Sequence, residues 1–124
     1  MKWQGPLILW SILLLYLTWS PKVELPDLGF DEQDKAAHFL AFFLLAWLAA
    51  RNFSKYEIIG LPRAVKRAAL FSIFFALIDE TVQIWIPGRL FDPLDAAANL
   101  LGTCTALCAF RRMVIFMQKR GWLW

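Results

Sequence analysis

Four apolar runs divide this chain of 124 residues, and polar or charged segments separate them. The runs cover about residues 5–19, 36–50, 68–86 and 93–110. A helix needs about 17–25 apolar residues to cross the hydrocarbon core of a bilayer. The third and fourth runs have this length, and aromatic residues flanking the first and second extend them as interfacial anchors. The pattern predicts an all-α protein, a bundle of four transmembrane helices in a single domain over residues 1–124.

Proline and glycine mark where the third and fourth runs meet. Pro87-Gly88 ends the third run. Asp92-Pro93 is a strong helix start, because Asp is a favoured N-cap and Pro is favoured in the first turn. The connection between the two runs is short, so we expect them to form an antiparallel hairpin. No small-residue cleavage site follows the first run, which we therefore expect to remain as a helix and not to be removed as a signal peptide.

Composition and charge favour the same class of protein. Hydrophobic residues make up 60% of the chain, more than a soluble domain of this length could bury. The net charge of +3 comes from Lys and Arg at the N-terminus, in the second loop and at the C-terminus. The positive-inside rule then predicts that both termini are cytoplasmic. The basic groups serve as topology anchors and contacts for anionic lipid, so we expect membrane lipids as partners and no nucleic acid.

Ionisable residues interrupt the apolar runs at matching depths. An acid at the centre of a membrane helix costs about 2.5–3.5 kcal/mol on insertion scales, and such a residue usually marks a functional site. At about 1.5 Å per residue, Glu80 lies about 10 Å below Pro87, and Asn99 lies about 9 Å below Pro93. These depths predict a polar pocket that opens outward. We predict that its binding residues are Asp34, Lys35, His38, Glu80, Gln83, Arg89, Asp95 and Asn99, with His38 and Glu80 as the candidate catalytic residues.

Glu80 also has a purely structural explanation. It could accept a hydrogen bond from Gln83 or Asn99 and so clamp two helices together. Such bonds contribute on average about 0.6 kcal/mol in membranes, which is less than the cost of inserting the acid. The comparison favours ligand binding or catalysis. For His38 two interpretations stay open: a general base oriented by Asp34, or a histidine bonded to a loop carbonyl.

Other polar residues near the outer surface have double interpretations as well. Asp92 is predicted to be mainly a helix cap, whereas Asp95 either shares that role or joins the polar stripe of Asn99. The guanidinium of Arg89 suits a phosphate or carboxylate ligand, although it could also pair with a neighbouring aspartate. Cys104 and Cys108 are predicted to be small buried packing residues.

A metal ion is a less favoured alternative. His38, Glu80 and Asp95 could supply its ligands. However, Gln83 stands where a Glu-x-x-His motif of a helical metal site would place its imidazole. We therefore predict no metal site and no cofactor.

The spacing of these residues resembles that of a known family. The strings Asp34-Lys35-x-x-His38-Phe39 and Glu80-x-x-Gln83-x-x-x-Pro87-Gly88-Arg89-x-x-Asp92-x-x-Asp95-x-x-x-Asn99-x-x-Gly102 are similar to the VanZ-like family. Its members are small bacterial membrane proteins, named after a factor in resistance to teicoplanin. The resemblance covers about two-thirds of the chain, and Ala106 stands where the family often has glycine. It implies a four-helix membrane fold and a cell-envelope role, but it does not supply a reaction.

These observations lead to one functional hypothesis and two alternatives. We expect a protein of the bacterial cytoplasmic membrane whose site faces the exoplasmic side. It would bind an envelope lipid, a cell-wall precursor or an amphiphilic antibiotic. Among these, we expect an anionic lipid or a cell-wall precursor as the ligand. The alternatives are a membrane enzyme that acts on a lipid head group and a structural partner in an envelope complex. Whether the protein is an enzyme, and whether it forms oligomers, stays open.

Overall fold

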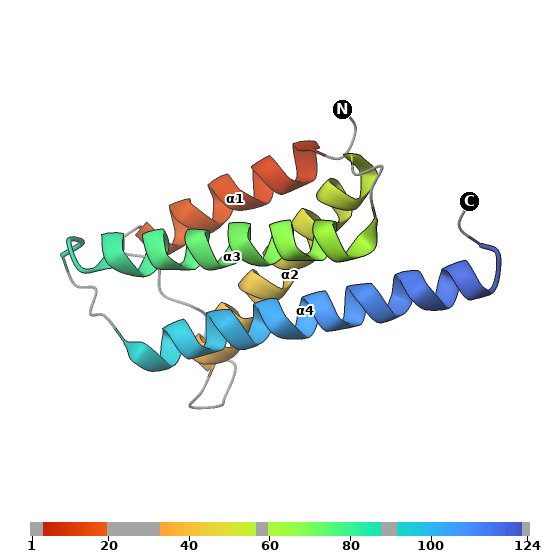
Figure 1. Cartoon of the computed structure of the whole chain (residues 1–124). Coiled ribbons are helices and arrows are strands. Elements are labelled where there is room, and N and C mark those ends of the chain that lie inside the picture. The colour runs from red at the N-terminus through yellow and green to blue at the C-terminus, as the bar shows by residue number, and fades with distance from the viewer. Residues whose placement is uncertain (1–3, 20–32, 57–59, 88–91, 123–124) are drawn as a thin grey trace.

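The computed structural model describes residues 4–19, 33–56, 60–87 and 92–122, and these form four helices. In chain order they are α1 (Gln4–Trp19), α2 (Gln33–Tyr56), α3 (Leu61–Gln83) and α4 (Pro93–Lys119). α3 and α4 run antiparallel, and the start of α1 lies at the same end of the bundle as the end of α4 (Figure 1). The predictions of an all-α fold and of an antiparallel hairpin are both confirmed.

The observed helices are longer than the apolar runs at several ends. α3 begins at Leu61 instead of residue 68, and α4 continues to Lys119 instead of ending at residue 110. The added turns include six Lys or Arg residues, which are good helix formers, so hydropathy locates the apolar part of a helix and not its ends. The cap prediction for α4 is confirmed, because the Asp92 side chain accepts a hydrogen bond of 2.9 Å from the Leu94 amide.

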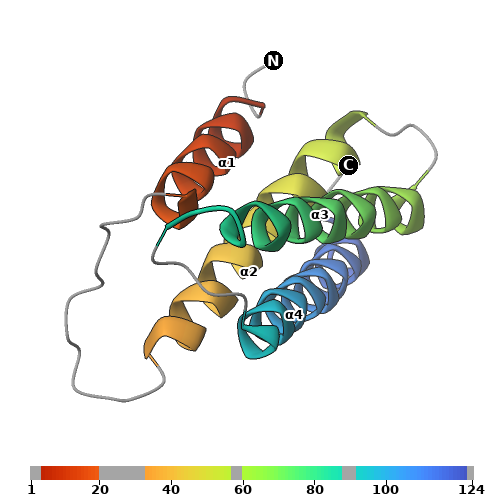
Figure 2. The same ribbon diagram turned by 90° about the vertical axis from the view of Figure 1, so that its left-hand side faces the viewer.

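α2 is the central helix and contacts each of the other three, most extensively α4 (Figure 2). Small residues allow this close approach. A methyl group at Gly102 of α4 would overlap the Phe39 carbonyl oxygen of α2 and lie 3.1 Å from the Phe43 amide nitrogen. Ala46 and Ala106 are fully buried beside this contact. The backbones of α2 and α4 therefore meet directly below the polar residues of both helices.

The outer faces of the bundle are apolar, whereas several polar side chains are buried inside it. Large exposed hydrophobic residues occur on all four helices and include Leu9, Ile12, Leu40, Leu70, Phe74, Leu77, Leu94 and Leu101. Within the described residues, two helices are long and apolar enough to cross a membrane, Asp34–Ser54 and Pro93–Lys119, and α1 is a shorter apolar helix. A polar interior beneath an apolar surface favours a membrane protein.

The prediction that Cys104 and Cys108 are buried is wrong, since both are exposed. Their spacing of four residues fits either face of α4. The packed face is taken by Gly102, Thr103 and Ala106, which leaves the two cysteines on the apolar outer face.

Candidate functional site

A polar cluster lies where α2 and α4 begin and α3 ends. Its members are His38 of α2, Glu80 of α3, and Asp95 and Asn99 of α4, with exposed fractions of 9%, 5%, 7% and 0%. The helix start at Gln33 and the Asp92 cap bring His38 and Asp95 one turn into their helices. The sequence predicts His38, Glu80 and Asn99 at one depth, and the fold brings them together with Asp95 across three helices.

Asn99 links the cluster together. Its Nδ2 donates a hydrogen bond of 2.9 Å to Glu80 Oε1, and its Oδ1 lies 2.9 Å from His38 Nδ1. With its amide nitrogen directed to Glu80, Asn99 turns its carbonyl oxygen to the imidazole, and an amide oxygen can only accept hydrogen bonds. His38 Nδ1 therefore carries a proton and donates a hydrogen bond to Asn99 Oδ1. This chain of bonds fixes the orientation of the imidazole ring.

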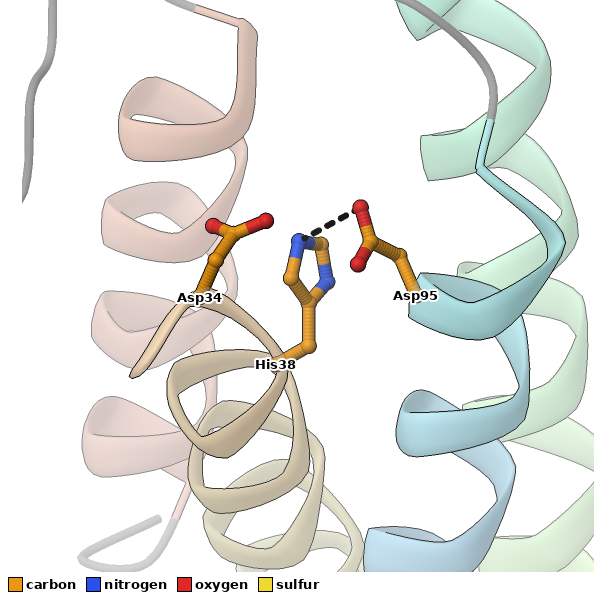
Figure 3. A group of neighbouring side chains, drawn as sticks. All are labelled: Asp34, His38 and Asp95. Carbon is orange, nitrogen blue, oxygen red and sulfur yellow. Dashed lines mark ion pairs between the residues drawn. The ribbon is translucent and has the colours of Figure 1, made fainter. Parts of the chain in front are cut away.

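The other ring nitrogen of His38 faces a carboxylate. Nε2 lies 3.6 Å from Asp95 Oδ2, as the dashed line in Figure 3 marks. Asp34 stands at the exposed rim on the other side of the ring, and its carboxylate lies with the His38 and Asp95 ligand atoms within 4.8 Å of one another. Asp95, and not only the predicted Asp34, is thus the carboxylate next to the imidazole.

Two carboxylate oxygens in the cluster accept no hydrogen bond from the described residues. They are Glu80 Oε2 and Asp95 Oδ1, and both are buried. A buried acceptor without a donor is destabilising by about 1–3 kcal/mol, more when it is charged. Such atoms are suited to a ligand donor or to a cation.

A second polar group joins α1 to α3. Thr18 Oγ1 donates a hydrogen bond of 2.5 Å to Asp79 Oδ1, and Gln83 Nε2 lies 3.5 Å from Asp79 Oδ2. The structure therefore directs Gln83 to Asp79 and not to the partner first considered for it, Glu80. Asp79 was not among the predicted binding residues. The rotation of about 100° between adjacent helical residues explains why it faces a different neighbour from Glu80.

The rim of the cluster carries an ion pair between α2 and α4. Lys35 Nζ lies 3.7 Å from Asp92 Oδ2, and both side chains are partly exposed. This pair lies at the same end of the bundle as the polar cluster. Arg89, predicted as an anion ligand, lies outside the described residues.

The fold and the site together define a class: a small helical membrane protein with a buried polar cluster near one end of its bundle. The chain belongs to the VanZ/LLP1 family, which matches residues 7–117. The resemblance to VanZ-like proteins is thereby confirmed. The chain is also 35% identical, over 101 residues, to an uncharacterized protein of Schizosaccharomyces pombe.

That alignment covers 77% of this chain and 54% of the yeast protein, so the chain spans about half the length of the curated relative it matches. No solved structure matches the chain. The family assignment therefore depends on sequence similarity, and the geometry of the polar cluster comes from the structure of this chain alone.

Proposed function

We propose that the chain crosses the membrane four times with both termini in the cytoplasm. The exposed leucines and aromatic residues of α1 and α3 support this, because they continue the apolar surface of α2 and α4. Most charges of α3 lie in its first two turns, and its two internal acids are buried against other helices. Exposed basic residues lie at the opposite end from the polar cluster and include Arg51, Arg63, Lys66, Arg67, Arg111, Arg112 and Lys119. This separation fits a cytoplasmic basic end and an exoplasmic polar cluster.

The cluster itself would bind the polar head group of an amphiphile drawn from the outer leaflet: an envelope lipid, a cell-wall precursor or an amphiphilic antibiotic. The observation that carries this proposal is the convergence of His38, Glu80, Asp95 and Asn99, with two buried carboxylate oxygens that the described residues do not satisfy. Interhelical hydrogen bonds of about 0.6 kcal/mol do not offset the insertion of two acids at about 2.5–3.5 kcal/mol each. A ligand that supplies hydrogen-bond donors or positive charge would offset the remaining cost of inserting the acids.

Among these ligands, a membrane lipid with a phosphate-bearing head group fits best. Arg89 follows α3 in the sequence, and a guanidinium suits a phosphate.

A second candidate function is an enzyme that acts on the same head group. The observation that favours it is the position of His38, which is held by Asn99 on one nitrogen and faces Asp95 with the other. An imidazole oriented in this way can move a proton to or from a bound ligand.

The binding proposal is tested by the lipids that co-purify with the protein. We expect the wild-type chain, extracted in mild detergent, to retain one lipid class above its share in the membrane. Glu80→Gln and Arg89→Ala should each reduce that retention, measured by mass spectrometry of extracted lipid. Thr105→Ala is the matched control, since Thr105 is exposed on α4 and bonds only to its own helix at Leu101. Unchanged retention in both site variants would contradict the proposal.

A further inference from the structure

The charge balance of the polar cluster conflicts with a phosphate ligand on its own. Asp34, Glu80 and Asp95 surround a single imidazole, and Lys35 pairs with Asp92. Carboxylates in this number repel an anion in a region of low dielectric constant. A positive charge at the centre of the cluster would remove that conflict.

The hydrogen bonds of His38 show where such a charge belongs. Because Nδ1 donates to Asn99, a neutral imidazole has its lone pair on Nε2, directed at Asp95. The separation of 3.6 Å exceeds the usual N–H···O distance of about 2.7–3.2 Å. Asp95 Oδ1 is buried and accepts no hydrogen bond from the described residues. A lone pair and a carboxylate therefore face one point from two helices.

We propose that Asp34, His38 and Asp95 bind a divalent transition-metal ion at this point. Ligand atoms at about 2.0–2.2 Å from such an ion lie about 3–3.6 Å apart, which matches the observed distance between His38 and Asp95. Asp34 is exposed, and its carboxylate lies on the other side of the ring, with a ligand atom within 4.8 Å of those of His38 and Asp95 (Figure 3). An imidazole with two carboxylates suits Zn²⁺ or Mn²⁺ better than Mg²⁺ or Ca²⁺, which prefer oxygen ligands alone.

The surroundings of His38 are those of a metal-binding histidine. Such a histidine usually donates its second ring N–H to a carboxylate, carbonyl or water, which fixes the tautomer. Here the acceptor is the Asn99 carbonyl, and Asn99 is in turn held by Glu80. This inference replaces our expectation of no metal. The set considered from the sequence was His38, Glu80 and Asp95, whereas the fold bonds Glu80 to Asn99 and brings Asp34 to His38 and Asp95.

The ion would also explain how a cluster of carboxylates can bind a phosphate-bearing lipid. This one step rests on the proposed function. Three protein ligands leave coordination positions open, and a phosphate oxygen of a lipid head group can take one of them. The carboxylates would then hold the ion, and the ion would hold the anion.

Metal binding is tested on the full chain in detergent, with Zn²⁺, Mn²⁺, Mg²⁺ and Ca²⁺ as separate probes and without added lipid. We expect about one Zn²⁺ or Mn²⁺ per chain after dialysis, measured by mass spectrometry of the metal. His38→Gln and Asp95→Asn should abolish the binding, and Asp34→Asn should weaken it at least about tenfold. Asp34 is exposed, so its variant keeps the test valid if the buried variants fail to fold.

Thr81→Ala is the matched control. Thr81 is next to Glu80 on α3, but its side chain is exposed and bonds only to its own helix at Leu77. Metal bound equally by all variants, or no stoichiometric Zn²⁺ or Mn²⁺ in the wild type, would overturn the proposed metal site. Because no lipid is present, this result is independent of the binding proposal, which fails separately if lipid retention is unchanged in Glu80→Gln and Arg89→Ala.

Discussion

Asn99 of α4 and Glu80 of α3 share a buried hydrogen bond of 2.9 Å, and the same Asn99 side chain reaches His38 of α2. One amide thus joins three helices and sets the tautomer of the imidazole. Its side chain is fully buried and uses both its oxygen and its nitrogen. The cluster depends on this residue more than on any charged one.

Replacing Asn99 by Ala should therefore destabilise the bundle. The change leaves Glu80 and His38 without their shared partner, and an unsatisfied buried polar group costs about 1–3 kcal/mol. We expect an earlier unfolding transition in detergent, followed by circular dichroism, and loss of metal binding in the folded fraction. Thr105→Ala, on the outer face of the same helix, should unfold like the wild type. An Asn99→Ala protein as stable as the wild type would show that the linkage is not needed.

The close contact of α2 with α4 leads to a second prediction. Gly102→Ala places a methyl group against the Phe39 carbonyl oxygen, which is backbone and cannot rotate away. Overpacking of this kind costs about 1–3 kcal/mol, so thermal stability should fall. Gly5→Ala is the control, because nothing lies within 4 Å of a methyl group there and alanine is the better helix former. Equal stability of the two variants would mean that α2 and α4 can separate freely.

Much of this arrangement could be predicted from the sequence, for identifiable reasons. Asp92-Pro93 located the start of α4, and the rise per residue put Glu80 and Asn99 at one level. Helical periodicity, however, gives only the face of a residue and not the identity of its partner. Asp95 next to His38 depends on how α2 and α4 rotate against one another. Gln83 next to Asp79 is a contact between residues four apart within α3, and the helical spacing allows it as readily as a contact with Glu80. The contact of Phe39 with Gly102 fixes that rotation, and it is a tertiary feature.

The bond between Thr18 and Asp79 predicts a separate role for α1. Thr18→Val removes the donor while keeping the shape of the side chain, so α1 should dock less firmly on α3. Interhelical hydrogen bonds in membranes contribute about 0.6 kcal/mol and rarely more than about 2, so the loss of stability should be modest. Lipid and metal retention should remain, because the polar cluster of α2, α3 and α4 does not include Thr18. Loss of lipid retention and of metal binding in a folded Thr18→Val protein would show that the bond between Thr18 and Asp79 is coupled to the polar cluster.

Membrane topology is tested with single cysteines. Cys104 and Cys108 are exposed on the apolar face, so both are first replaced by serine. A cysteine at Asp92 should react with a membrane-impermeant thiol reagent added to the exoplasmic side of intact cells, whereas one at Arg120 should react only after permeabilisation. These positions lie at opposite ends of α4. The reverse pattern would put the basic residues outside and contradict the proposed orientation.

The His38→Ala variant distinguishes a protein that only binds its lipid from an enzyme that acts on it. If the protein only binds its lipid, His38→Ala should lower lipid retention, and no product should form with either the wild type or the variant. If the second candidate function is correct, purified wild-type protein incubated with phosphate-bearing membrane lipids and Zn²⁺ or Mn²⁺ should release a product that His38→Ala does not. The physical reason is that Nε2 is the ring nitrogen that Asn99 does not hold, so it is the atom that can exchange a proton with a head group or bind the proposed ion. Product analysis by mass spectrometry distinguishes the two outcomes, with Thr81→Ala as the control that should match the wild type. A product formed equally by His38→Ala would exclude the imidazole from the chemistry, because alanine at this position can neither take up nor release a proton.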